Sequence, residues 1–241
     1  MDVVQRVRFL PMNMATINWR KAATEFVVIV LGVLAALAVD QWRDDRKDRA
    51  TEAEYLIRLH ADLSTDIQTF TSLELIFETK ASIIKDLRDQ SLPALLSRDQ
   101  DSLVQDLVFS GFTSLPASQA STFDELLSTG RLALIQDVAL RDALSRYYTD
   151  FEFISQILFG GSHGNYLRLL QESLPGELFY QWRLSNSLDN PEDLHNGLEV
   201  LLSEPGLAAA ANAEITYSAA LIYYLRHYRG QAEELLELLN E

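Results

Sequence analysis

The sequence predicts an all-α protein, in which one N-terminal transmembrane helix continues into a helical stalk and an extramembrane helical bundle. Two observations predict this fold. An uncharged apolar run occupies Phe26–Val39, and apolar residues further along recur at steps of three and four, the spacing of one helix face. No stretch alternates apolar and polar residues for long enough to indicate a β-strand. The 241 residues suffice for an anchor and one domain of roughly 200 residues.

The apolar run alone is too short to cross a bilayer, because its 14 residues rise only ~21 Å against a hydrocarbon core of ~30 Å. A helix from Ala22 to Trp42 would reach ~31 Å and place Trp19 and Trp42 near the two interfaces. Glu25 and Asp40 then lie near the ends of the span. We therefore divide the chain into an N-terminal tail (1–21), a transmembrane helix (22–42) and an extramembrane all-helical domain (43–241).

A cleaved signal peptide is the competing interpretation of this segment. Four basic residues precede the run, and the small-residue pattern Ala36-Leu37-Ala38 resembles a cleavage site. No loop signal follows Ala38, however, and residues 40–47 continue as a charged helix, which favours a retained anchor.

The orientation of the span is harder to predict, because both flanks carry four basic residues and the positive-inside rule barely discriminates between them. Moving the cations of the short tail outward against ~100 mV would cost about 2.3 kcal/mol per charge, whereas large domains cross largely regardless of charge. We therefore expect the N-terminus inside and the domain outside.

The extramembrane part is expected to contain only helices. Residues 43–54 carry no large apolar side chain but have oppositely charged pairs at helical spacing, which predicts a solvated stalk. An amphipathic helix follows as far as Leu87 and is closed by Pro93. Helix-capping residues and helix-breaking Gly and Pro predict further helices. These cover Asp99–Ser110, Ser121–Gly130, Asp137–Phe159, Asn165–Ser173, Pro191–Ser203 and the stretch from after Gly206 to Leu239.

The segment Leu207–Leu225 is apolar enough to be considered as a second span. Asn212, Glu214, Thr216 and Ser218 would make its burial at mid-bilayer costly. We therefore expect a packed helix of the domain.

Three blocks of sequence carry a resemblance: EFVVIVLGVLAALAVDQW from Glu25, TFDELLSTGRLALI from Thr122 and DVALRDALSRYY from Asp137. Together they resemble a family of uncharacterised single-span bacterial membrane proteins, a domain of unknown function. The blocks cover less than a third of the chain, and the middle one is the most specific. The resemblance implies a bacterial source and the same layout. With the orientation expected above, the domain would be periplasmic and the anchor would lie in the inner membrane. It implies no activity and no functional residue.

Charge and composition exclude several classes of protein. The net charge of −15 repels phosphate backbones, so we expect no nucleic acid partner. Cysteine is absent, which excludes disulfides and thiolate metal sites. No phosphate-binding loop or dinucleotide fingerprint occurs in the sequence.

The sequence contains weak signals for chemistry, and each has a simpler structural explanation. Glu192 and His195 match half of a di-iron motif but lie in an exposed first turn. Ser162 and His163 lie in a glycine-rich helix break without a nucleophile elbow. The tyrosines of the long helices suit core packing better than a ligand cage. We therefore expect no catalytic, metal or cofactor site.

Two sets of residues are candidates for contacts. At about 100° per residue, Gly32 lies about 20° from Glu25 and Ala36 about 20° on the other side, so Glu25, Gly32 and Ala36 form a stripe on which a second membrane helix could pack. Glu25 reaching the headgroups is the alternative. Arg131, after the expected cap at Gly130, suits an ion pair with Asp124, Glu125 or Asp137, and anion capture is the sharper alternative.

The function that fits best is a membrane-anchored, non-enzymatic interaction protein, an accessory subunit or scaffold of a membrane complex. Its expected partners are the lipid bilayer and a membrane protein or a second copy of itself. The alternative is a ligand-binding or sensory helical domain on a membrane stalk. A hydrolase that uses scattered acidic residues is the third hypothesis.

Overall fold

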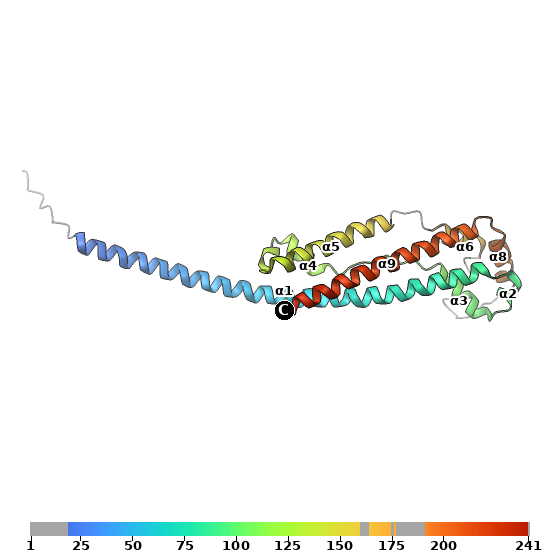
Figure 1. The fold of residues 1–241 in the computed structure, drawn as a ribbon, viewed down its shortest axis with the longest axis horizontal. Coiled ribbons are helices and arrows are strands. Elements are labelled where there is room, and N and C mark those ends of the chain that lie inside the picture. Colours follow the sequence, from blue (N-terminus) through green and yellow to red (C-terminus); the bar gives the residue numbers. More distant parts are fainter. Residues whose placement is uncertain (1–18, 160–163, 175, 177–190, 241) are drawn as a thin grey trace, which may run out of the picture. The chain divides into compact units, whose positions relative to one another are not determined.

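The structure, a computed structural model, describes residues 19–159, 164–174, 176 and 191–240. Every regular element in these ranges is helical, and no strand occurs in them, which confirms the all-α prediction (Figure 1). The elements are α1 (Trp19–Asp89), α2 (Leu92–Leu96), α3 (Gln100–Ser110), α4 (Ser121–Ser128), the 3₁₀ helix η1 (Leu132–Leu134), α5 (Val138–Phe159), α6 (Asn165–Ser173), α8 (Pro191–Ser203) and α9 (Leu207–Leu239). The chain divides into two compact units, residues 1–51 and 52–241.

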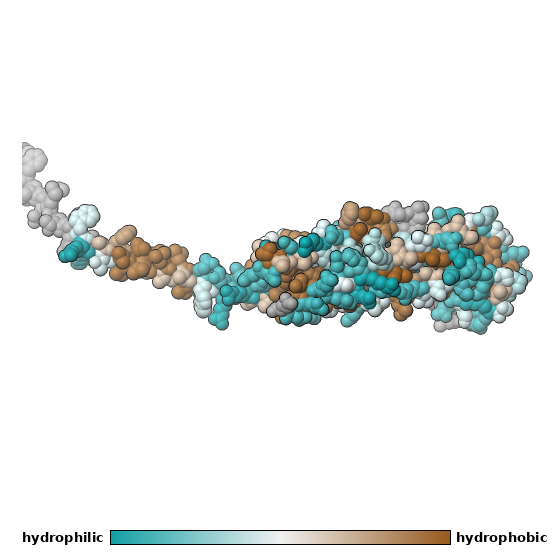
Figure 2. All heavy atoms as spheres, viewed as in Figure 1, coloured by the Kyte–Doolittle hydropathy of each residue, from teal (hydrophilic) through white to brown (hydrophobic). Residues whose placement is uncertain are grey.

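The first unit contains the apolar part of α1. None of its most apolar 18-residue window is buried, and the helix is long and apolar enough to cross a membrane. Figure 2 shows this segment as a hydrophobic band with polar residues on either side of it. The helix has no break at Ala38, where the signal-peptide interpretation would place cleavage. Retention and cleavage of this segment both stay predictions, because a signal sequence near the N-terminus can also be long and apolar.

The second unit has two apolar cores. The first joins α1, α4, α5 and α9, and Phe70 of α1 stacks on Phe151 of α5 with ring centroids 5.3 Å apart. The second core joins the last turns of α1 to α2, α3, α6, α8 and the first half of α9. The two long helices, α1 and α9, contribute to both cores.

From Leu63 on α1 and from Ala211 on α9, most buried residues follow a regular 3,4 spacing, which is typical of helices that pack along their length. Glu74 is buried outside this spacing. On α1 they are Leu63, Asp66, Phe70, Leu73, Phe77, Lys80, Ile84 and Leu87. On α9 they are Ala211, Glu214, Ser218, Leu221, Leu225, Tyr228, Ala232 and Leu235. Burial along the whole length of α9 agrees with its expected place in the domain rather than in the bilayer.

The helices differ from the expectations in two places. Pro93 lies in the first turn of α2, a short helix that was not predicted, instead of simply closing α1. The 3₁₀ helix η1 was also not predicted. The compact second unit begins at Glu52, and Tyr55, the first residue after the predicted stalk, is buried. The predicted division at residues 21/22 and 42/43 stays a prediction.

Candidate functional site

A layer of buried polar side chains separates the two apolar cores. On α1, Lys80 lies between Phe77 of the first core and Ile84 of the second. On α9, Glu214 and Ser218 lie between residues of the second core and residues of the first. All three polar residues are buried, so the layer is part of the packed interior.

An ion pair forms the centre of this polar layer. Lys80 is 1% exposed, and its Nζ donates to Glu214 Oε1 at 2.5 Å and to the Phe112 carbonyl at 2.7 Å. Beside it, the Tyr166 hydroxyl donates to Ser110 Oγ at 3.2 Å. Burial raises the pKa of Tyr166 to about 12, and the nearby Glu214 charge adds to this effect. Burying two opposite charges costs less when they are paired and hydrogen-bonded, as Lys80 and Glu214 are here.

A hollow of about 440 Å³ adjoins the polar layer. It lies among the carboxyl-terminal end of α5, the start of α6 and the first half of α9, and Glu214 and Tyr166 are part of its lining. Its volume falls in the range of about 300–1,000 Å³ that small-molecule sites occupy. The remaining lining residues are Ile157, Leu158, Gly164, Asn165, Ala210, Ala213, Thr216, Tyr217 and Ala220.

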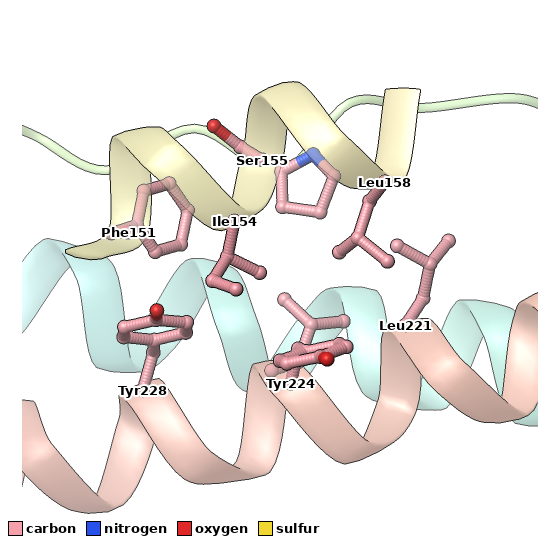
Figure 3. A pocket seen from close by; sticks show the side chains of 9 residues that line it. Phe151, Ile154, Ser155, Leu158, Leu221, Tyr224 and Tyr228 are labelled. Carbon is pink, nitrogen blue, oxygen red and sulfur yellow. The ribbon is translucent and has the colours of Figure 1, made fainter. Parts of the chain in front are cut away.

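Next to this hollow, α5 and α9 pack closely and leave almost no space between them. In Figure 3, Phe151 and Ile154 of α5 face Tyr224 and Tyr228 of α9. The space that remains there is about 10 Å³, which is room for about one water molecule. Most of the long-helix tyrosines are buried or partly buried, as expected, but Tyr223 is 66% exposed, so core packing was the wrong interpretation for that residue.

A second buried carboxylate, Asp66, fastens the segment before α4 to α1. It accepts hydrogen bonds from the Gln119 N–H at 2.5 Å and from the Tyr147 hydroxyl at 2.7 Å. Burial raises the pKa of Asp66 to about 6, although both hydrogen bonds oppose the shift. One turn earlier, Asp62 accepts from the Thr122 N–H at 3.1 Å and so caps the start of α4.

Arg131 lies in a polar cluster with Tyr55, Arg58 and Glu125. The ion pair to Glu125 comes from Arg58, at 2.6 Å, while Arg131 Nη1 donates to the Tyr55 hydroxyl at 3.2 Å. Hydrogen bonds from Arg58 and Tyr55 hold the pKa of Glu125 below its usual value. Within the described ranges, no carboxylate lies within 4 Å of the Arg131 guanidinium. Both hypotheses for Arg131, ion pair and anion capture, therefore stay predictions.

The predicted contact stripe lies on the exposed apolar part of α1. Glu25 is 3.9 Å from Lys21, one turn earlier. Gly32 and Ala36 are exposed, and a Cβ at Gly32 would meet no atom within 4 Å. A second membrane helix could therefore approach closely at this point, and the stripe stays a prediction.

The other sequence signals do not gather into a site. His60, His195 and His227 are exposed, and His163 and its glycine-rich segment lie outside the described residues. In the part of the chain that the structure describes, no group of three or more histidine or acidic side chains is arranged to hold a metal ion.

A family model matches residues 25–193, which is more than half of the chain, and its description is a family of unknown function, DUF6090. The chain belongs to this family. The DUF6090 match includes Asp66, Lys80 and Arg131, whereas Glu214 and the rest of α9 lie beyond it. No curated protein and no solved structure matches the chain.

Sequence reasoning missed the residues at the centre of this DUF6090 protein, namely Asp66, Lys80 and Glu214. A signal for them is present in the sequence, because each takes one position of an otherwise apolar 3,4 repeat. A polar residue at such a position commonly fixes the register of packed helices. What the sequence could not show is which residue on the other helix pairs with it.

Proposed function

We propose that this DUF6090 protein is a membrane-anchored, non-enzymatic interaction protein, an accessory subunit or scaffold of a membrane complex. The observation that carries the proposal is the unburied apolar part of α1, which needs a lipid or protein environment. We further propose that the membrane is a bacterial inner membrane, with the N-terminus in the cytoplasm and the domain in the periplasm. The basic residues of the short tail support this orientation.

An exposed apolar surface on α5 supports partner binding by the domain itself. Phe153 and Ile157, one turn apart, are 61% and 55% exposed. Hydrophobic atoms gather at this end of α5 in Figure 2. Large apolar side chains that adjoin on a surface often mark contacts with other proteins. The buried charged groups, by contrast, are engaged inside the domain, as Lys80 is with Glu214.

Site-specific photo-crosslinking tests this proposal in intact membranes. A photoreactive amino acid replaces Phe153 in the full chain, and in the control it replaces Asp142, which is also exposed on α5. The two positions are 11 residues apart and so differ by only about 20° around the helix. We expect one discrete protein crosslinked from position 153 and not from 142. Equal patterns from both positions would contradict the proposal.

The ligand-binding alternative rests on the hollow beside Glu214, which shares Ile157 with the exposed surface of α5 but includes neither Phe153 nor the membrane span.

A further inference from the structure

We infer that the hollow beside Glu214 binds a small molecule that has an apolar body and a neutral head group able to donate a hydrogen bond. The hollow shares Ile157 with the exposed surface of α5, but the inference does not use the partner binding proposed for that surface. It rests on the size of the hollow, on its mostly apolar wall and on the buried ion pair at its edge.

The wall favours an apolar body. Ile157 and Leu158 of α5 contribute large apolar side chains, and Ala210, Ala213 and Ala220 of α9 contribute small ones. Small residues along α9 keep the space open, because a larger side chain at these positions would fill it. A ligand that covers this wall gains about 25 cal/mol for each Å² of apolar surface that it removes from water.

The edge of the hollow favours a donor head group. A carboxylate accepts hydrogen bonds at both oxygens and donates none. Lys80 occupies Glu214 Oε1, and no donor from the described residues reaches Oε2. Thr216 uses its hydroxyl hydrogen on the Asn212 carbonyl at 2.8 Å, so towards a ligand this hydroxyl can only accept. Both groups therefore pair with a ligand that donates.

The ion pair also explains why the head group is neutral. Lys80 already compensates the charge of Glu214 at 2.5 Å, so an added ammonium group would bring a positive charge without a partner. An anionic head group would face the Glu214 carboxylate in a chain of net charge −15. A hydroxyl or an amide group adds no unpaired positive charge and is not repelled by the Glu214 carboxylate.

The test uses three water-soluble probes with similar apolar bodies: 2-phenylethanol, 2-phenylethylamine and 3-phenylpropanoate. Binding to the full chain in lipid nanodiscs is measured by saturation-transfer NMR, with empty nanodiscs subtracted. We expect 2-phenylethanol to bind roughly tenfold more tightly than the amine or the acid. No binding of the alcohol, or equal binding of all three probes, would overturn the inference.

Two exposed alanines on α9 give matched variants. Ala213 lines the hollow, whereas Ala219 does not. We expect Ala213→Trp to weaken 2-phenylethanol binding roughly tenfold or more and Ala219→Trp to leave it unchanged. Equal binding by the two variants would show that the probe binds elsewhere.

A third variant tests the role of the ion pair. Lys80→Met/Glu214→Gln removes both buried charges together, so neither is left unpaired. We expect it to bind the alcohol but to discriminate less against the acid. Unchanged discrimination in a variant with a wild-type circular-dichroism spectrum would overturn the assignment of Glu214 as the head-group contact. None of these outcomes affects crosslinking from position 153, so the two proposals fail separately.

Discussion

At the scale of single residues, Asp66 combines a buried charge with two hydrogen-bond donors. Its carboxylate is 1% exposed, and the donors come from the segment before α4 and from α5. These hydrogen bonds connect three parts of the domain. Burial makes the ionised form of Asp66 less stable in the folded protein than in water, and this raises the pKa of Asp66 to about 6.

The first prediction is that Asp66→Asn reduces the pH dependence of stability. The pKa of Asp66 is about 6 when folded and 3.8 as a reference, so the folded chain binds more protons between these values. Below about pH 4, protonated Asp66 contributes its full share to the free energy of unfolding. This contribution is lost as the pH rises through about 6, and the total loss is about 3 kcal/mol. Chemical denaturation of both proteins from pH 3 to 7 measures the difference. The exposed Asp150→Asn serves as the control, and a constant difference between wild type and Asp66→Asn across this range would contradict the prediction.

The second prediction concerns the pair of Lys80 and Glu214. Lys80→Met leaves the buried Glu214 without compensation and should lower the free energy of unfolding by about 3–5 kcal/mol. The double variant Lys80→Met/Glu214→Gln should recover most of this loss, because no buried charge then lacks a partner. Urea denaturation measures both values. A double variant no more stable than the single one would show that the pair does not act as a unit.

At the scale of elements, α4 ends in a turn that requires glycine. Gly130 has a φ of 67°, and the Arg131 and Gly130 N–H groups donate to the carbonyls of Leu126 and Leu127 at 2.8 and 3.1 Å. This is the Schellman pattern, in which the residue after the helix cap takes a left-handed conformation. The expected cap at Gly130 is therefore present in the structure.

The third prediction is that two Gly→Ala substitutions have opposite effects. Gly130→Ala should destabilise the domain by about 1–2 kcal/mol, since a Cβ disfavours the left-handed conformation. Gly230→Ala, inside α9 with nothing within 4 Å of the new Cβ, should stabilise it by about 0.5–1 kcal/mol. Denaturation midpoints measure both effects. Changes of the same sign would contradict this account of the turn.

The ends of most helices could be predicted because local chemistry sets them. Asp137, for example, accepts hydrogen bonds from the Ala139 and Leu140 N–H groups at 2.8 and 3.1 Å. An aspartate before an apolar helical pattern predicts a helix start, and α5 begins at the next residue. The site could not be predicted in the same way. The pair of Lys80 and Glu214 joins residues 134 positions apart, and helical spacing shows which face each occupies but not what it meets.

The fourth prediction concerns the membrane helix as a contact surface. Gly32→Leu/Ala36→Leu should abolish an association through this helix, because larger side chains prevent close approach. Val33→Ala/Leu37→Ala changes neighbouring positions of similar depth and should not abolish it. Chemical crosslinking in mild detergent compares the two. Equal behaviour would mean that the helix only anchors the chain.

At the scale of the whole molecule, α1 is one continuous helix from Trp19 to Asp89. α1 contains an apolar segment with no buried residue and then supplies core residues to the second unit. This continuity agrees with the prediction that the N-terminal helix continues into a helical stalk. The central claim is that the apolar segment lies in the bilayer and that the charged residues after it lie in water.

Cysteine labelling tests this claim most directly, because the natural chain contains no cysteine. Single substitutions Leu34→Cys and Ala50→Cys are made in the full chain at two positions exposed on α1. A membrane-impermeant maleimide is applied to intact cells, to membranes isolated without detergent and to samples solubilised in a denaturing detergent. We predict rapid labelling of Ala50→Cys from outside, and labelling of Leu34→Cys only after denaturing solubilisation. Labelling of Leu34→Cys in intact membranes as fast as Ala50→Cys would contradict the central claim.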